Sequence, residues 1–213
     1  MDRDLVWYVS YGSNMNAERL ACYIQGGRPP GALIGYTGAR DRTPPREAAG
    51  VMLPGRLHFA GESRVWSGGM GFYDHDAEGP TPARAFLLTI PQFADVAAQE
   101  MHRPVQEDDP VERLVREDLG IGGGTDATAA PAGTRVAVGP GRYETLVVLG
   151  ERDGIPMLTF TAPEGIGEVP ATQPVPAYLD MLAEGLRQSH GWDRERADAY
   201  FAARGADLER VGV

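Results

Sequence analysis

Residues 5–15 read LVWYVSYGSNM, an apolar run followed directly by a polar segment. The run from Leu5 to Val9 is short and rich in β-branched and aromatic residues, which predicts a buried strand. Asn14 and Asn16 are both candidate N-caps for a helix through about Gln25, whose apolar residues recur at helical spacing. The stretch therefore predicts a buried strand that turns sharply into a helix.

The junction between this strand and this helix is a place where proteins hold small anions. The first turn of a helix presents backbone N–H groups without partners at the positive end of the helix dipole, and Gly12 lets the backbone approach a ligand closely. A carboxylate is the group expected there. The residues alone leave a second interpretation open, in which Gly12, Ser13 and Asn14 only form the turn and the cap.

Length and charge narrow the class of protein. The chain has 213 residues, enough to bury one core, and shows no internal repeat, so we expect a single domain over residues 1–213. No apolar run approaches the roughly 20 residues that span a bilayer, and the N-terminus lacks the features of a signal peptide. We therefore expect a cytoplasmic protein without a membrane partner. The net charge of −10 argues against nucleic acid as a partner.

The sequence predicts neither a metal nor a tightly bound cofactor. Cys22 is the only cysteine, which excludes a thiol-rich metal site, and the histidines are scattered without ligand spacing. No phosphate loop or dinucleotide fingerprint is present, and Ser13 lacks the G-x-S-x-G context of a serine hydrolase. The expected partner is a small molecule, and the expected oligomeric state is a monomer or a homodimer.

Hydrophobic periodicity and turn residues predict the remaining elements. We expect strands over 32–36, 56–59, 83–90, 143–149 and 157–161, two strand pieces joined by a glycine-rich bend in 65–73, and helices over 91–100, 108–119, 177–189 and 193–204. The last two strands flank Asp153-Gly154 and are typical of a β-hairpin. Strands that pair mainly through hairpins, with helices inserted between them, favour an α+β fold.

Four segments of the chain resemble, in the same order, the signatures of a known family. Tyr11-Gly12-Ser13-Asn14-Met15, followed by Glu18-Arg19-Leu20, is similar to the YGSN(L/M) and ER(I/L) signature of the γ-glutamylcyclotransferase-like family. Trp66-Ser67-Gly68-Gly69 resembles the W-x-G-G segment of that family, Gln99-Glu100 its L-D-x-Q-E-G catalytic segment, and Pro176-Ala177-Tyr178 its late P-x-Tyr. The resemblance spans residues 5–203.

This resemblance implies a fold, an activity and a set of site residues. The fold is a small mixed closed β-barrel with helices packed around one mouth. The activity is the cyclisation of a γ-glutamyl amide or peptide to 5-oxoproline with release of an amine, with Glu100 as general acid/base. Met101 stands where the family has glycine, so the entrance to the site is expected to differ in shape. The implied substrate-binding residues are Tyr11, Gly12, Ser13, Asn14, Met15, Trp66, Gly68, Gly69 and Tyr178.

Each of these residues also has a purely structural interpretation. Glu100 ends a predicted helix, where a solvated surface glutamate is the commoner finding. Trp66 and Tyr178 are equally compatible with core aromatics, and Gly68-Gly69 with a strand bulge. The corresponding alternative function is a non-catalytic domain that binds a small amino-acid-like ligand or acts as a regulatory module.

About 40 residues lie between Glu100 and the next tyrosine-led strand, a longer connection than usual and longer than the family has. They contain the predicted helix of 108–119 and a segment low in bulky residues, so 103–141 is interpreted as an insertion. We expect it to reach over the pocket mouth and to select the leaving amine, with Asp108, Asp109 and Glu112 favouring cationic amines. A surface excursion without a role is the alternative.

Overall fold

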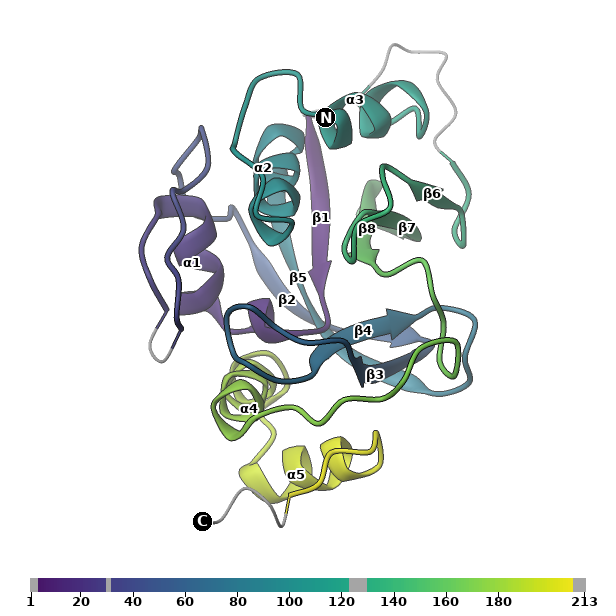
Figure 1. Ribbon diagram of the computed structural model, residues 1–213. Coiled ribbons are helices and arrows are strands. Elements are labelled where there is room, and N and C mark those ends of the chain that lie inside the picture. Colours follow the sequence, from purple (N-terminus) through teal and green to yellow (C-terminus); the bar gives the residue numbers. More distant parts are fainter. Residues whose placement is uncertain (1–3, 30–31, 123–129, 209–213) are drawn as a thin grey trace.

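The computed structural model describes residues 4–29, 32–122 and 130–208. Its main element is a mixed six-stranded sheet (Figure 1). Within this sheet β1 pairs in parallel with β8, and the other neighbouring strands are antiparallel. A second sheet holds two antiparallel strands, β3 (Arg56–Ala60) and β4 (Met70–Asp74). The order across the main sheet is β2 (Ala48–Pro54), β5 (Pro80–Thr89), β1 (Leu5–Ser10), β8 (Ile155–Thr161), β7 (Thr145–Arg152) and β6 (Arg135–Ala137).

Helices cover both faces of the main sheet (Figure 1). One face carries α1 (Ala17–Gln25), α2 (Ile90–Glu100) and α3 (Pro110–Glu117), and the other carries the second sheet and α4 (Pro176–His190), against which α5 (Arg194–Ala202) packs. Side chains of β1 alternate between the two cores, because Val6 and Tyr8 enter the first and Trp7 and Val9 the second. A strand buried on both faces reads as a continuous apolar run, which explains the sequence of β1.

The strand and the helix that open the chain are confirmed. A short 3-10 turn, η1 (Ser13–Met15), connects β1 to α1. Asn16 is the N-cap of α1, and its Oδ1 accepts hydrogen bonds from the backbone N–H groups of Glu18 at 2.9 Å and Arg19 at 3.2 Å. Since Asn16 caps the helix, Asn14 is left with its side chain free for contacts elsewhere.

The later helices and the hairpin also lie where the pattern predicts them. The bounds of α2, α3, α4 and α5 fall within two residues of the predicted ranges. The hairpin of β7 and β8 turns at Asp153 and Gly154, whose φ angles of 55° and 72° suit an Asp-Gly turn. The fold is α+β, as expected. Within the described ranges, no helix combines the length and the apolar character needed to cross a membrane.

The predicted closed barrel is not found. The main sheet is open, with β2 and β6 as its edges among the described strands. The second sheet meets the first through threonine hydroxyls: Thr81 Oγ1 accepts from the N–H of Leu57 at 3.1 Å, and Thr161 Oγ1 accepts from the N–H of Tyr73 at 3.0 Å. Because these side chains take the place of backbone acceptors, the hydrogen-bond ladder does not continue from one sheet into the next.

Three segments differ from the sequence prediction. Residues 32–36 do not form a strand; Tyr36 makes an isolated bridge with Gly27, and the side chain of Leu33 is 63% exposed. The two strand pieces expected in 65–73 are a turn followed by β4. Neither β2 nor β6 was predicted. The glycine-rich end of the insertion, residues 123–129, lies outside the described residues.

The threonine link between the two sheets gives a first prediction. Thr161 Oγ1 accepts from Tyr73 N and donates to Tyr73 O at 2.8 Å, and the residue is 1% exposed. Thr161→Val leaves both backbone groups of Tyr73 without this partner, so we expect a loss of about 1–3 kcal/mol in the free energy of unfolding. Urea denaturation would measure it.

Thr159→Val is the matched control. Thr159 is also 1% exposed, but its Oγ1 has no hydrogen-bond partner among the described residues. Replacing a buried, unpaired hydroxyl with a methyl group is expected to be neutral or stabilising. Equal losses for the two variants would show that the hydroxyl of Thr161 does not join the sheets.

Candidate functional site

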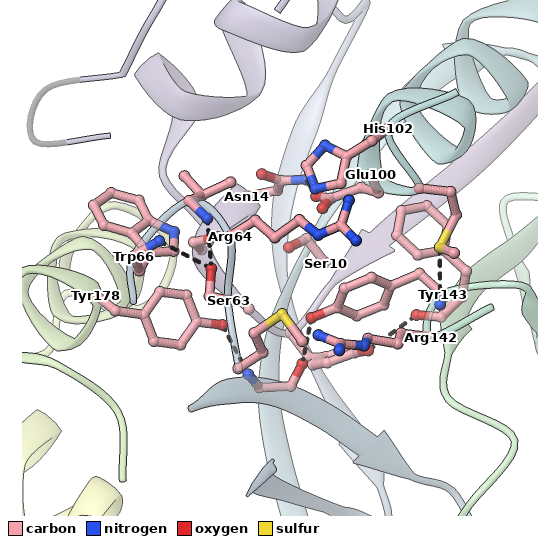
Figure 2. Close-up of a pocket in the computed structure, with 18 of the residues that line it drawn as sticks. Ser10, Asn14, Ser63, Arg64, Trp66, Glu100, His102, Arg142, Tyr143 and Tyr178 are labelled. Carbon is pink, nitrogen blue, oxygen red and sulfur yellow. Dashed lines mark hydrogen bonds between the residues drawn. The ribbon is translucent and has the colours of Figure 1, made fainter. Parts of the chain in front are cut away.

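A cavity of about 390 Å³ opens where the C-terminal end of β1 meets the end of α2, the start of β4 and the first turn of α4. Figure 2 shows Glu100 and Asn14 at one side of it and Tyr178 and Trp66 at another. Its walls come from segments far apart in the chain, among them Tyr8, residues 10–14, 63–66, 100–102 and 140–143, and Tyr178. A volume of this size suits a small organic ligand.

Most of the site residues expected from the sequence meet at this cavity. They come from four separate elements that the main sheet brings together. The expected residues that line the cavity are Tyr11, Gly12, Ser13, Asn14, Trp66, Glu100 and Tyr178.

Met15, Gly68 and Gly69 are not among the residues that line the cavity. The Met15 side chain is 1% exposed and belongs to the apolar core against α4. Gly68 and Gly69 face a crossing segment: a Cβ on Gly69 would overlap the carbonyl oxygen of Thr172, and one on Gly68 would lie 2.7 Å from Val175 Cγ1. Their small size therefore serves chain packing at this point.

The glycine of this bend that lines the cavity is Gly71, two residues further on. Its N–H donates to the hydroxyl of Tyr178 at 3.0 Å, and its carbonyl accepts from the hydroxyl of Tyr143 at 3.0 Å. A Cβ at Gly71 would lie 3.0 Å from Tyr178 Oη. The sequence signal was present in the glycine-rich bend, but its spacing did not show which glycine approaches the cavity.

Hydrogen bonds of Glu100 and of its neighbour Gln99 hold the end of α2 at the cavity wall. Its Oε1 accepts from Asn14 Nδ2 at 2.7 Å, and the same Nδ2 lies 3.2 Å from the hydroxyl of Tyr8. Gln99 ties the end of α2 to α1, since its Nε2 donates to the carbonyl of Tyr23 at 2.9 Å. Glu100 is half-buried, so its carboxylate meets both the cavity and solvent.

Four tyrosines that line the same cavity remain neutral phenols at ordinary pH. Burial is the largest cause that raises the pKa of Tyr8, Tyr11, Tyr143 and Tyr178. For Tyr178 burial raises the pKa to about 12, although the hydrogen bond from Gly71 lowers it in part. Because its oxygen accepts from Gly71, Tyr178 keeps its own proton for donation.

The backbone donors at the start of α1 are not free, contrary to the expectation for a helix N-terminus. Asn16 Oδ1 accepts from Glu18 and Arg19, and Gln188 Oε1 accepts from the N–H of Ala17 at 2.9 Å. The first turn of α1 is therefore satisfied within the protein. The preceding segment, residues 11–14, is the part of this junction that lines the cavity.

Arg19 is a site residue that the sequence analysis quoted in a motif but did not assign. It lines the cavity and is 3% exposed. Its Nε donates to Ser13 Oγ at 2.7 Å, and its Nη2 donates to the hydroxyls of Tyr23 at 3.0 Å and Tyr36 at 3.1 Å. The signal in the sequence was a charged residue four positions before Tyr23 on the buried side of a helix.

The mouth of the cavity carries two arginines and not the expected acids. Arg64 and Arg142 line it together with His102, and Arg142 Nη1 donates to the carbonyl of Glu62 at 2.6 Å. The insertion reaches the cavity through its last residues, Pro140 and Gly141, with Arg142 directly after them.

The three acids expected to recognise a cationic amine lie elsewhere, so that expectation is wrong. None of Asp108, Asp109 and Glu112 lines the cavity. Asp109 caps α3, is fully buried and pairs with Arg103 at 2.7 Å. Glu112 pairs with Arg40 at 2.8 Å. Both carboxylates stabilise the packing of α3, which the helix-capping pattern alone could not separate from a binding role.

No cluster of three or more histidine, cysteine, aspartate or glutamate side chains suited to a metal ion occurs within residues 4–29, 32–122 and 130–208.

No family model matches the chain. Histone deacetylase 5 from Arabidopsis thaliana is 35% identical over 206 residues, a match that covers 92% of this chain and 30% of that protein. The chain thus spans less than a third of the length of this curated relative.

Solved structures similar to this chain include a gamma-glutamyl cyclotransferase and an uncharacterized human protein. Each is 14% identical with a TM-score of 0.49 and covers 93% of this chain, which in turn covers 87% and 88% of theirs. Likeness at this level concerns the fold alone, and we argue function from the residues of the cavity.

Proposed function

We propose that this chain is a γ-glutamylcyclotransferase-like enzyme that converts a γ-glutamyl amide or peptide to 5-oxoproline and an amine. The observation that supports this most is the carboxylate of Glu100, half-buried at the wall of a small-molecule cavity and held by Asn14 at 2.7 Å. Ring closure is intramolecular, so an enzyme has to fold its substrate and move protons. The cavity offers a base for the second task and a set of fixed donors for the first.

The proposed reaction needs one proton acceptor that later becomes a donor. Glu100 takes a proton from the substrate's α-ammonium group, and the freed amine attacks the γ-amide carbonyl carbon. A new carbon–nitrogen bond closes the five-membered ring, and the ring nitrogen passes its second proton to the departing nitrogen. Glu100 returns the first proton to the same nitrogen as the amide carbon–nitrogen bond breaks, so the amine leaves as an ammonium ion and Glu100 is again a carboxylate. Since Asn14 occupies Oε1, the other carboxylate oxygen of Glu100 is the one that meets the substrate.

The negative charge that develops on the amide oxygen needs donors close by. The backbone N–H groups of residues 11–14 remain our proposed donors, together with the neutral phenol of Tyr178. The N–H of Met15 leaves this set, because it donates to the carbonyl of Gly12 at 3.0 Å. Trp66 would exclude water from this part of the cavity, because its ring lies beside that of Tyr178 at 6.0 Å between centroids.

The assay that tests the proposal measures 5-oxoproline release from a panel of γ-glutamyl compounds. We expect turnover, and we expect leaving amines that carry a carboxylate, such as those of γ-glutamyl dipeptides, to react faster than cationic amines. The reason is the positive charge that Arg64 and Arg142 place at the cavity mouth. This preference should shrink at high salt, because exposed charges are screened.

Two results would contradict the proposal. Tight binding of these compounds without product from any of them would favour a non-catalytic binding domain. Turnover with a preference for cationic amines would keep the enzyme but remove the assigned role of the mouth arginines.

A further inference from the structure

Three buried polar atoms without a hydrogen-bond partner belong to residues that line this cavity: Nη1 of Arg19, Oδ1 of Asn14 and Nε1 of Trp66. The side chains of Arg19 and Asn14 are 3% and 2% exposed and supply a charged donor and an acceptor. Buried polar groups in proteins are almost always paired, so a donor and an acceptor left open at one cavity indicate a ligand that supplies both partners.

The charge on Arg19 makes the open donor the more informative of the two. The groups in contact with the guanidinium are neutral: the hydroxyls of Ser13, Tyr23 and Tyr36, and the ring of Trp66 at 5.3 Å. The carboxylate of Glu100 attracts it without forming an ion pair and is one of the causes that raise the pKa of Arg19. No carboxylate lies within ion-pair distance of Arg19 in the described part of the chain. A buried guanidinium without a carboxylate in direct contact is unfavourable, and an anionic ligand beside Nη1 would reduce that cost.

The open acceptor lies beside negative charge. Asn14 donates from its Nδ2 to Glu100, and its Oδ1 is left as an acceptor without a partner on a residue that lines the cavity. One cavity therefore holds a cationic donor from Arg19 and an acceptor next to a carboxylate. The head group of an α-amino acid, with a carboxylate and an ammonium on one carbon, is complementary to this pair.

We propose that Arg19 Nη1 binds the α-carboxylate of the ligand and that Asn14 Oδ1 accepts a hydrogen bond from its α-ammonium group. The assignment rests on the proposed function and adds to it the residues that recognise the amino-acid head. Arg19 carries the carboxylate because its planar guanidinium is already fixed by Ser13 and the two tyrosines. The same placement sets the α-amine beside Glu100, where its proton is to be removed.

Calorimetric titration of the unmodified protein tests this with three compounds. L-glutamate carries both head groups, isoglutamine has an amide in place of the α-carboxylate, and glutarate lacks the ammonium. We expect L-glutamate to bind at least about tenfold more tightly than either analogue. Isoglutamine lacks the negative charge that pairs with Arg19, and glutarate leaves Asn14 Oδ1 without a donor. Equal affinity for L-glutamate and isoglutamine, or no binding of L-glutamate at millimolar concentration, would overturn the assignment.

The variant Arg19→Lys then tests whether Arg19 is the residue that recognises the α-carboxylate. We expect the preference for L-glutamate over isoglutamine to fall to less than about threefold, while the preference over glutarate persists. Arg113→Lys, an exposed arginine on α3 that does not line the cavity, is the matched control and should keep both preferences. An unchanged preference in Arg19→Lys would overturn the assignment.

If Arg19→Lys does not fold, Ser13→Ala removes the hydroxyl that orients Nε and should also reduce the preference for the α-carboxylate. An unchanged preference in a folded Ser13→Ala protein would count against the assignment in the same way. All of these measurements report binding and not turnover. A protein that shows the predicted preferences but releases no 5-oxoproline would contradict the proposed function while supporting this inference.

Discussion

Replacing Glu100 with glutamine is expected to reduce kcat for 5-oxoproline release by about 10²–10⁴-fold. Glutamine keeps the shape of the side chain and an oxygen that can accept from Asn14 Nδ2. In the unmodified protein this Nδ2 lies 2.7 Å from Glu100 Oε1. It cannot take a proton from the substrate's ammonium group. Because the lost interaction concerns proton transfer, KM should change much less than kcat.

Glu117→Gln is the matched control for this experiment. Glu117 is an exposed residue of α3 and does not line the cavity, so the same chemical change there should leave turnover near that of the unmodified protein. Near-normal turnover by Glu100→Gln on a compound that the unmodified protein converts would remove Glu100 from the reaction.

Adding a methyl group at Gly69 is expected to lower the free energy of unfolding by about 3 kcal/mol, at the upper end for overpacking. Its Cβ would overlap the Thr172 carbonyl oxygen and lie 2.8 Å from the Thr172 carbonyl carbon. These are backbone atoms, which cannot rotate away as a side chain can. The hydrogen bond from Gly69 N to Gln173 O, 2.8 Å long, would also be strained.

The measurement is the midpoint of thermal unfolding, for which we expect a decrease of about 6–12 °C in Gly69→Ala. Gly12→Ala is the control, because a Cβ there would make an ordinary contact of 3.5 Å with Tyr178 Oη. A stable Gly69→Ala protein that instead loses affinity for its ligand would restore the ligand-approach role that the sequence suggested for this glycine.

Local signals in the sequence were sufficient for most elements of the fold. The apolar run before Tyr11 predicted β1, and Asp153-Gly154 predicted the hairpin of β7 and β8. The helices were found from their caps and apolar spacing, as with Thr89 and Gln92, which form a capping box at the start of α2. These features depend on residues close in sequence, which is why the sequence alone could reveal them.

Features that depend on distant partners could not be predicted in the same way. Residues 48–54 contain Gly50 and end in Pro54, so they do not read as a strand, yet they pair with β5 at the sheet edge, where both residues are tolerated. Residues 32–36 have the composition of a strand but no partner for a ladder. The open sheet likewise depends on two threonines at the border between the sheets.

The candidate site shows the same division. The residues around Glu100 and Asn14 were expected to converge, and the cavity brings them together. Gly71 lines the cavity in place of the predicted Gly68 and Gly69, which pack against residues 172–175. A glycine pattern in the sequence does not reveal which segment will cross it. Arg19 was missed because its role depends on contacts that form only in the folded protein. There, three hydroxyl groups and the ring of Trp66 surround its guanidinium.

The central place of β1 has a consequence for when the cavity comes into existence. Trp7 pairs with Leu87 on one side and with Met157 on the other, so the strand is locked between segments from the middle and the late part of the chain. Contacts at such sequence separation form slowly, because the entropy of closing a long loop opposes them. The wall made by residues 11–14 follows β1 directly and takes its position only after both neighbours have docked. During synthesis the cavity therefore cannot form before β8 has emerged, and Tyr178 of α4, which follows β8, completes its lining.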